Sequence, residues 1–206
     1  MTKGMLISFE GLDGCGKSTQ VQLLAERLQS LGYPVRIFRE PGATPLSEYI
    51  RQLLLHTEME ISPIAEMLLF NAARAQLVHS AIRPALEAGA IVLCDRFDDS
   101  TTAYQGYGRG LPLAVVLQCN QIATDGLKPA LTFVLDVPVE LALQRSQKSD
   151  RMEQAGLLFF ERVRWGYREI ALREPDRVIC VDATYTPDEV HTTIWHHVCR
   201  RLPSLL

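Results

Sequence analysis

A phosphate-binding loop is the clearest chemical signal in the chain. Residues 11–18 read GLDGCGKS, which fits the pattern GxxxxGK[S/T]. The motif follows the short apolar run Leu6–Glu10 and opens the helical pattern Ser18–Leu31, and this strand–loop–helix setting is the one that such loops need. Glycines let backbone N–H groups converge on phosphate oxygens, and the start of the helix adds partial positive charge. The loop therefore predicts a site for the phosphates of a nucleoside triphosphate.

Side chains in and near this loop add chemistry of their own. Lys17 is placed to reach the β- and γ-phosphates, and the Ser18 hydroxyl is placed to bind Mg²⁺. A second acid, Asp95, ends the buried apolar run Ile91–Asp95 and suits the carboxylate on the magnesium side of such a site. The residues expected around the triphosphate are Gly11, Asp13, Gly14, Cys15, Gly16, Lys17, Ser18 and Thr19.

The elements that must position these residues alternate along the chain. Continuous apolar runs are typical of strands that are buried on both faces of a parallel sheet, and helical patterns lie between them. Alternation of this kind predicts an α/β fold with a five-stranded parallel sheet and helices on both faces. Together with the phosphate loop, it indicates the three-layer P-loop NTPase fold. The expected strands are Leu6–Glu10, Val35–Arg39, Ile91–Asp95, Leu131–Asp136 and Val178–Val181. The expected helices are Ser18–Leu31, Pro45–His56, Pro63–Ala88 with a break near Pro84, Pro112–Thr124, Val139–Ser146, Leu157–Arg173 and Pro187–Arg201.

Composition sets limits on the class of protein. The chain has 206 residues, of which 47% are apolar and 22% charged, and we expect one domain over 1–206. A net charge of −3 gives no general attraction to nucleic acid or to anionic membranes, so we expect neither as a partner. The sequence shows no apolar stretch long enough to span a bilayer and no signal-peptide pattern, so a cytoplasmic location is the expectation. Five cysteines without CxxC spacing predict buried thiols rather than disulfides or a zinc site.

Two classes of phosphate-loop protein compete at this point. A GTP-binding switch needs an NKxD sequence, and the chain contains none. A kinase for a small anionic acceptor needs basic residues on several loops, which neutralise two converging phosphate groups. The chain offers such residues, several of them just after expected strands: Arg39, Arg51, Arg74, Arg96, Arg109, Arg145, Lys148 and Arg151. A nucleotide-binding regulatory module without transfer activity is a third interpretation.

Longer motifs distinguish among these classes. Beyond the phosphate loop, the chain carries FREPG at 38–42, EMLLFNAARAQ at 66–76 and CDRFDDSTTAYQGYGRG at 94–110. Further along, KPALTFVLDVP occupies 128–138 and VDAT occupies 181–184. In order and spacing, these segments resemble the bacterial thymidylate kinases over essentially the whole chain. The resemblance implies transfer of the γ-phosphoryl group of ATP to dTMP with Mg²⁺, for dTTP synthesis and DNA replication, and it implies a homodimer.

The resemblance also assigns roles, position by position. Phe70 resembles the aromatic residue that stacks on thymine, and Arg74 resembles the guanidinium that reads the base edge. Their i,i+4 spacing places both on one helix face, which agrees with that assignment. The acceptor site that the resemblance implies contains Asp13, Glu40, Arg51, Phe70, Arg74, Arg96, Thr101, Tyr104 and Gln105, and the metal ligands that it implies are Ser18, Asp95 and Glu40.

A lid over the triphosphate is expected at about 145–155. Arg145 resembles the arginine that stacks on adenine. The phosphate loop has no arginine among Leu12, Asp13, Gly14 and Cys15, and the lid sequence RSQKSDRME has few. We therefore hypothesise that Lys148 or Arg151 supplies the transition-state cation. The expected catalytic residues are Lys17, Asp95, Arg96, Arg145, Lys148 and Arg151.

Overall fold

A parallel sheet forms the centre of the fold in the computed structural model, which describes residues 4–146 and 156–202. Its strands lie in the order β2-β3-β1-β4-β5, and each adjacent pair is parallel. The predicted five-stranded parallel sheet is therefore confirmed, and the expected strand bounds are correct to within one residue. The strands are β1 (Met5–Glu10), β2 (Val35–Arg39), β3 (Ile91–Asp95), β4 (Leu131–Asp136) and β5 (Val178–Asp182).

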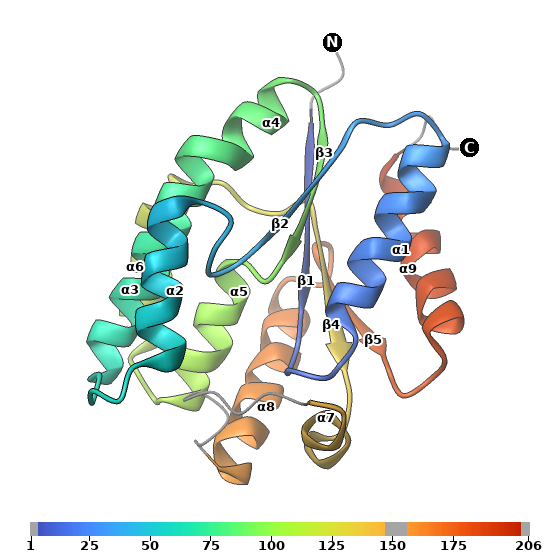
Figure 1. The fold of residues 1–206 in the computed structure, drawn as a ribbon. Helices are drawn as coiled ribbons and strands as arrows, with labels where there is room; N and C mark the ends of the chain where they lie inside the picture. Colours follow the sequence, from blue (N-terminus) through green and yellow to red (C-terminus); the bar gives the residue numbers. More distant parts are fainter. Residues whose placement is uncertain (1–3, 147–155, 203–206) are drawn as a thin grey trace.

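Helices cover both faces of this sheet. Figure 1 shows α1 and α9 on one side, whereas α3 to α6 and α8 lie on the other. Helix α2 packs outside α3. The helical elements are α1 (Lys17–Ser30), α2 (Pro45–His56), α3 (Pro63–Leu77), η1 (Val78–Ile82), α4 (Arg83–Glu87), α5 (Asp98–Thr101), η2 (Thr102–Gly108), α6 (Leu113–Thr124), α7 (Val139–Arg145), α8 (Leu157–Arg173) and α9 (Pro187–Arg201). None of the helices in this described part combines the length and hydropathy that crossing a bilayer demands.

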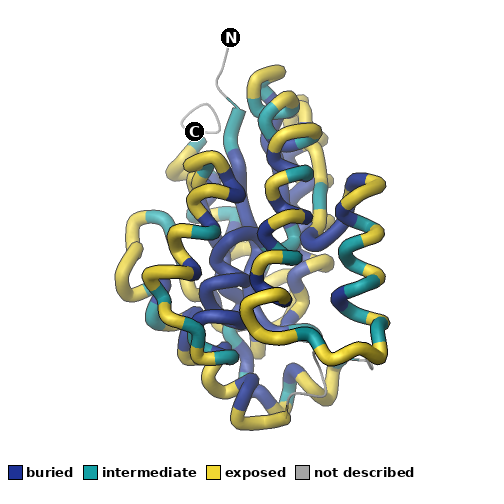
Figure 2. Tube along the Cα trace, turned by 90° about the vertical axis from the view of Figure 1, so that its left-hand side faces the viewer, coloured by how far each residue is buried: buried dark blue, intermediate teal, exposed yellow. Residues whose placement is uncertain are grey.

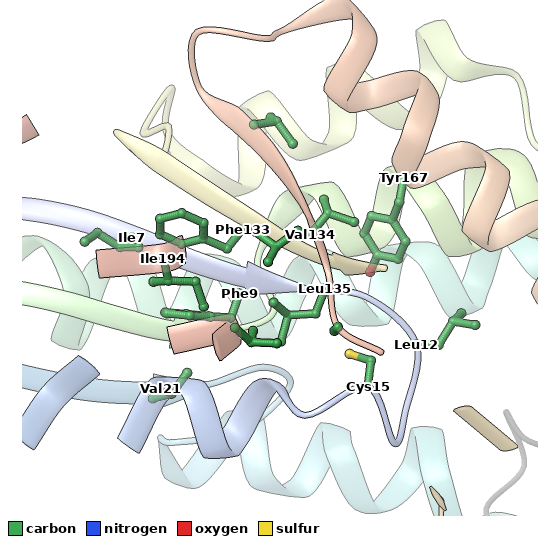
Figure 3. Close-up of a cluster of buried hydrophobic side chains, with 14 of the residues drawn as sticks. Ile7, Phe9, Leu12, Cys15, Val21, Phe133, Val134, Leu135, Tyr167 and Ile194 are labelled. Carbon is green, nitrogen blue, oxygen red and sulfur yellow. The ribbon is translucent and has the colours of Figure 1, made fainter. Parts of the chain in front are cut away.

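Successive side chains along β1 point to opposite faces of the sheet and so join two different clusters of the core. Ile7 and Phe9 belong to a large cluster with the apolar stripe of α1, whereas Leu6 belongs to a second cluster with η1. Figure 2 shows buried residues gathered along the centre of the molecule. Figure 3 shows that Leu12 and Cys15 extend the large cluster into the phosphate loop. The loop is thus anchored to the core by its own side chains, and Cys15, only 2% exposed, is a packing residue.

The long helical pattern from Pro63 is interrupted earlier than we expected. The break begins at Val78, where η1 forms a wide π-type turn, and regular helix resumes at Arg83. Pro84 lacks an amide hydrogen, and its ring crowds the carbonyl one turn before it. Widening the preceding turn accommodates both effects, so the distortion lies upstream of the proline.

A second helical region, α5 and η2, has no counterpart among the expected helices. It lies within the motif at 94–110, and all its residues except Tyr107 are buried. Because those buried residues include Asp98, Asp99, Thr102 and Gln105, the segment shows no apolar stripe from which a helix could be predicted. Its polar groups pair within the protein, for example through Asn120, whose amide donates to the Asp98 carbonyl and to Thr102.

Helix α8 packs tightly against η2, and Gly166 marks the point of closest approach. A Cβ atom at Gly166 would lie 2.7 Å from Cδ2 and 2.8 Å from Cβ of Tyr107. We expect Gly166→Ala to lower the free energy of unfolding by about 1–3 kcal/mol, because overpacking outweighs the gain in helix propensity. Urea unfolding would measure the change. Leu172→Ala, at a position 74% exposed on the same helix, should change stability by less than about 0.5 kcal/mol. Equal stability of Gly166→Ala and the parent chain would contradict this packing.

Candidate active site

The phosphate loop ends where α1 begins, and the start of this helix is open. Its N-cap is Gly16, with φ of 98°, and no side chain caps the first turn. The first turn also lacks an acidic residue. Backbone N–H groups and the positive end of the helix dipole are therefore available to an anion. Gly14 makes the tight loop possible, because a Cβ there would lie 2.3 Å from the carbonyl oxygen of Ala142 in α7.

Two polar side chains of this helix start are already held in place. The Lys17 ammonium donates to the carbonyls of Leu12 at 2.8 Å and Gly11 at 3.3 Å. The Ser18 hydroxyl, in the first turn of α1, donates to Oδ2 of Asp95 at the end of β3 at 2.9 Å. A hydroxyl and a carboxylate side by side are oxygen ligands of the kind that Mg²⁺ accepts when substrate phosphates supply others. The donor set at this point therefore fits magnesium.

Arg96 follows directly after β3 and has an unusual backbone. Its φ is +72°, a conformation that residues with a Cβ rarely adopt. Its guanidinium donates to the Gly11 carbonyl at 2.9 Å and to Asp13 Oδ1 at 3.2 Å. The group also lies 5.1 Å from the centre of the Tyr104 ring. These contacts fix the guanidinium beside the phosphate loop, so backbone strain and side-chain pairing occur at one residue.

A buried carboxyl group, Glu10, supports the loop that follows Arg96. Glu10 is the last residue of β1 and has no exposed surface. One oxygen accepts from the Phe97 amide at 2.7 Å, and the other accepts from the hydroxyls of Ser100 at 2.5 Å and Tyr167 at 3.0 Å. Burial raises the pKa of Glu10 to about 8, and the negative charge of Asp99 adds to this shift. The end of β1 thus holds α5 and α8 together behind Arg96.

Three cavities lie in a row along the carboxyl edge of the sheet. The central cavity, about 460 Å³ in volume, covers the phosphate loop and the start of α1. On one side it continues into a cavity between the loop and α9, and the two share Gly14, Gly16, Thr19 and Arg145. On the other side it meets a cavity bounded by α2, α3 and η2. The wall common to those two consists of Asp13, Glu40, Arg51 and Arg96.

This third cavity is small, and its lining is mixed in chemistry. Beyond the shared wall it is lined by Pro41, Leu55, Phe70, Arg74, Ser100, Thr101, Tyr104 and Gln105. Aromatic and aliphatic surfaces provide a place for a flat ring, and hydroxyl and amide groups provide a polar rim. Its volume is about 70 Å³, well below the several hundred Å³ of typical ligand sites, so its walls must part to admit a nucleotide.

Comparisons with known proteins agree with this geometry. The family model described as thymidylate kinase matches residues 9–194. The chain is 52% identical to a thymidylate kinase of Chlorobaculum parvum, an alignment that covers 92% of this chain and 93% of the relative. It is 47% identical to a thymidylate kinase of Deinococcus radiodurans over 98% and 99% of the two chains. A crystal structure of thymidylate kinase from Ehrlichia chaffeensis, 38% identical, superposes with a TM-score of 0.78 and covers 95% of this chain and 98% of that one.

The chain belongs to the thymidylate kinase family. The structure brings most of the predicted site residues together. Phe70 and Arg74 line the same cavity, as their spacing on α3 requires. Phe70 is partly exposed, so it is a wall of the cavity rather than a residue of the core. Thr101, Tyr104 and Gln105 reach that cavity from α5 and η2.

Arg74 is buried and hydrogen-bonded within the protein, which the sequence did not indicate. It is 2% exposed, and its Nε donates to Glu40 Oε2 at 2.7 Å. The same guanidinium donates to Thr101 Oγ1 at 3.0 Å and to the carbonyl of Phe97 at 2.9 Å. Burial raises the pKa of Glu40 to about 7, whereas the charge of Arg74 acts in the opposite direction. The second oxygen of Glu40 is buried and has no hydrogen-bond partner among the residues that the structure describes, so a ligand or ion in the cavity could pair with it.

The remaining predicted residues lie on the central cavity or outside the described part. Arg51 lines both the central and the third cavity, and it donates to the Pro41 carbonyl at 2.9 Å. Arg145 ends α7 and donates to the carbonyl of Ala183 at 3.2 Å, between the phosphate loop and α9. Lys148 and Arg151, and most of the expected lid at about 145–155, lie outside the described residues.

Sequence reasoning missed several residues that shape the site. The sequence pattern indicates only that Glu10 ends a strand, although an acid directly before the first glycine of a phosphate loop could have marked it as a residue of the site. Glu66 is 1% exposed and pairs with Arg109 and with Gln105, which lines the third cavity. Tyr167 reaches the site from a helix that carries no motif, so its position depends on the tertiary fold alone.

The Glu10 carboxyl gives a prediction for pH-dependent stability. Its pKa is raised from 4.5 to about 8 in the folded protein, so between these values the folded state holds a proton that the unfolded chain releases. The stabilisation from this group is complete below its unfolded pKa and is lost as the pH rises through about 8. We expect thermal unfolding to show a larger loss of stability from about pH 6 to about pH 9 in the parent chain than in Glu10→Gln. Identical pH dependence in the two proteins would contradict this assignment.

Proposed function

We propose that this chain transfers the γ-phosphoryl group of ATP to dTMP, giving ADP and dTDP, and so supplies the precursor of dTTP for DNA replication. One observation carries the proposal. The cavity over the phosphate loop and the cavity lined by aromatic and amide groups meet at a wall of two arginines and two carboxylates. A donor phosphate chain and an acceptor phosphate would meet at that wall.

ATP would occupy the two cavities around the phosphate loop. The open start of α1 and the Lys17 ammonium would bind the β- and γ-phosphates. Arg145 lies beside Ala183 and Pro187 in the adjoining cavity, where the purine ring fits against its guanidinium. The Ser18 and Asp95 side chains would hold magnesium, with Glu40 as a further acid on the same cavity. When bound, the ion neutralises charge on the β- and γ-phosphate oxygens.

The monophosphate acceptor would occupy the third cavity, beside Phe70. Its thymine ring fits beside Phe70, and its phosphate fits against Arg51 and Arg96 at the shared wall. Thr101, Gln105 and Arg74 supply the polar groups nearest to the ring. Tyr104 lines the same cavity beside Arg96, and there it would crowd a ribose 2′-hydroxyl. Asp13 would then lie near the 3′-hydroxyl of the sugar.

Direct in-line transfer requires little covalent chemistry from the protein. The acceptor phosphate is already ionised and needs no general base, so the enzyme has to bring two anions together and exclude water. Arg96 suits the first task because its guanidinium is fixed before substrate arrives, so binding requires no reorganisation of this group. A lid at about 145–155, closing over a single domain of 206 residues, would serve the second task. Lys148 or Arg151 in that lid would supply a further cation to the transferring group.

We also propose that the enzyme acts in the cytoplasm.

The proposed activity predicts a clear order of acceptors. In a coupled assay of ADP release with ATP and Mg²⁺, we expect dTMP to be turned over ahead of dUMP and well ahead of dCMP, AMP and GMP. Arg96→Lys should lower kcat/KM for dTMP by about 100-fold or more, because lysine cannot reproduce the forked contact. Arg173→Lys, at an exposed position on α8, should leave kcat/KM unchanged. Fastest turnover with another acceptor would overturn the proposal.

We propose further that two copies of the chain associate through α3 and α6. Ile64, Leu68, Ala72 and Ala75 form an exposed apolar stripe at helical spacing on α3. Ile122, 72% exposed, adds to this surface from the neighbouring α6. A contiguous apolar face of this kind is typical of a protein–protein interface. Because the stripe lies on the helix that carries Phe70 and Arg74, association would also stiffen one wall of the acceptor cavity.

The mass of the protein in solution tests this association. Light scattering after gel filtration should give twice the chain mass of 23.1 kDa. Leu68→Asp should reduce the value to that of one chain, because a charge in an apolar interface stays unpaired. Leu172→Asp, on the outer side of α8, serves as the matched control and should leave the mass doubled. A parent chain that is monomeric at assay concentration would contradict the proposal.

A further inference from the structure

Gln105 is held by a hydrogen bond that fixes which end of its amide faces outward. The residue lies in η2, is 1% exposed and lines the third cavity with Phe70 and Thr101. Its Nε2 donates to Glu66 Oε1 at 3.0 Å. A side-chain amide has a donor end and an acceptor end, and a rotation of 180° exchanges them. The partner of one end therefore decides what the other end offers to the cavity.

Glu66 can serve only as an acceptor in this pair. It lies in the first turn of α3 with a side chain 1% exposed. Arg109 Nε reaches Glu66 Oε1 at 3.1 Å, and Arg109 Nη2 reaches Glu66 Oε2 at 3.2 Å. This forked contact stabilises the ionised carboxylate, which has no proton to donate. If the Gln105 amide were reversed, its oxygen would face a carboxylate oxygen in a buried place, so chemistry as well as geometry selects the observed orientation.

We propose that Glu66 is a positioning residue that makes Gln105 present its carbonyl oxygen to the base of the acceptor nucleotide. The inference rests on the proposed function, because it takes a pyrimidine monophosphate as the occupant of this cavity. Thymine and uracil carry an N–H group at ring position 3, whereas cytosine has an unprotonated acceptor nitrogen there. The fixed oxygen pairs with the first two bases and opposes the third.

The energetic consequence is a rejection of dCMP that needs no steric clash. With cytosine in the cavity, two acceptors would face each other away from water, and neither could recover the hydrogen bond that it makes in solution. Sites built to pair a buried polar group reject analogues without the matching group by about 10⁴-fold or more. Glu66 would therefore govern the choice of base from behind Gln105, without touching the substrate.

The variant Glu66→Gln tests this role because it keeps the size of the side chain and removes its acceptor-only character. An amide at position 66 can pair with Gln105 in either orientation, so the Gln105 amide can turn its nitrogen to the base. We expect the ratio of kcat/KM for dTMP to that for dCMP to fall by at least about tenfold, mainly through a lower KM for dCMP. A merely structural role of Glu66 would lower both values together, and an unchanged ratio would overturn the inference.

Two controls separate positioning from damage to the fold. Glu48→Gln removes a partly exposed carboxylate of α2 that pairs with Arg39, and it should leave the base preference unchanged. Glu66→Asp keeps an acceptor-only group and should retain the preference for dTMP even if overall activity falls. Loss of the preference in Glu66→Asp to the same extent as in Glu66→Gln would count against the proposal.

A binding measurement on the parent chain tests the same contact if Glu66→Gln does not fold. Calorimetry should show that 3-methyl-dTMP, which lacks the N–H group, binds at least about tenfold more weakly than dTMP. The monophosphate of 5-bromodeoxyuridine, which keeps that group, should bind within a few-fold of dTMP. Equal affinity for dTMP and its 3-methyl derivative would overturn the inference. If the parent chain turns over no pyrimidine monophosphate, the proposed function fails instead.

Discussion

The carboxyl group of Glu10 is the interaction on which the arrangement of the site depends. It stands at the end of the central strand, with its two oxygens occupied by the Phe97 amide and by the hydroxyls of Ser100 and Tyr167. These partners belong to segments that are far apart in the chain, so one side chain joins β1, α5 and α8. Arg96 lies immediately before this junction in a backbone conformation that is unfavourable for a residue with a side chain. Its φ persists because the residues that follow are tied down, and the guanidinium is thereby aimed at the phosphate loop.

Strand order explains why the chemistry collects at one edge. Because β1 and β3 are adjacent and parallel, the phosphate loop and Asp95 leave the sheet side by side, and Ser18 can bond to Asp95 directly. The loop after β2 brings Glu40 to the same edge. Helices α3 and η2 then close the space beyond this edge and place a cavity next to the loop. Two ligand spaces with a common charged wall are a consequence of this topology.

The sequence predicts a functional feature where the residues that form it lie close together in the chain. The phosphate loop, the five strands and the i,i+4 pair of Phe70 and Arg74 could be predicted because spacing alone determines their geometry. The helical region at 98–108 could not, since its buried polar residues remove the apolar period from which helices are recognised. The partners of Glu66 and Arg74 also escaped prediction, because these ion pairs join segments 34 to 43 residues apart. A residue such as Tyr167 carries no motif, and its hydroxyl reaches the site only after α8 has packed on η2.

Charge distribution connects the buried network with the binding of two anions. The whole chain has a net charge of −3, yet the central cavity is lined by more basic than acidic side chains: Lys17, Arg39, Arg51, Arg96 and Arg145 against Asp13, Glu40 and Asp95. The acceptor cavity is organised differently, because Arg74 and Arg109 are each paired with a buried carboxylate. Pairing cancels their charge, so these arginines orient groups around a neutral base rather than attract phosphate. The excess of basic over acidic side chains lies instead in the central cavity, around the phosphate loop. On the proposed function, the paired arginines near the base and the excess of basic side chains around the phosphate loop would together orient the two nucleotides.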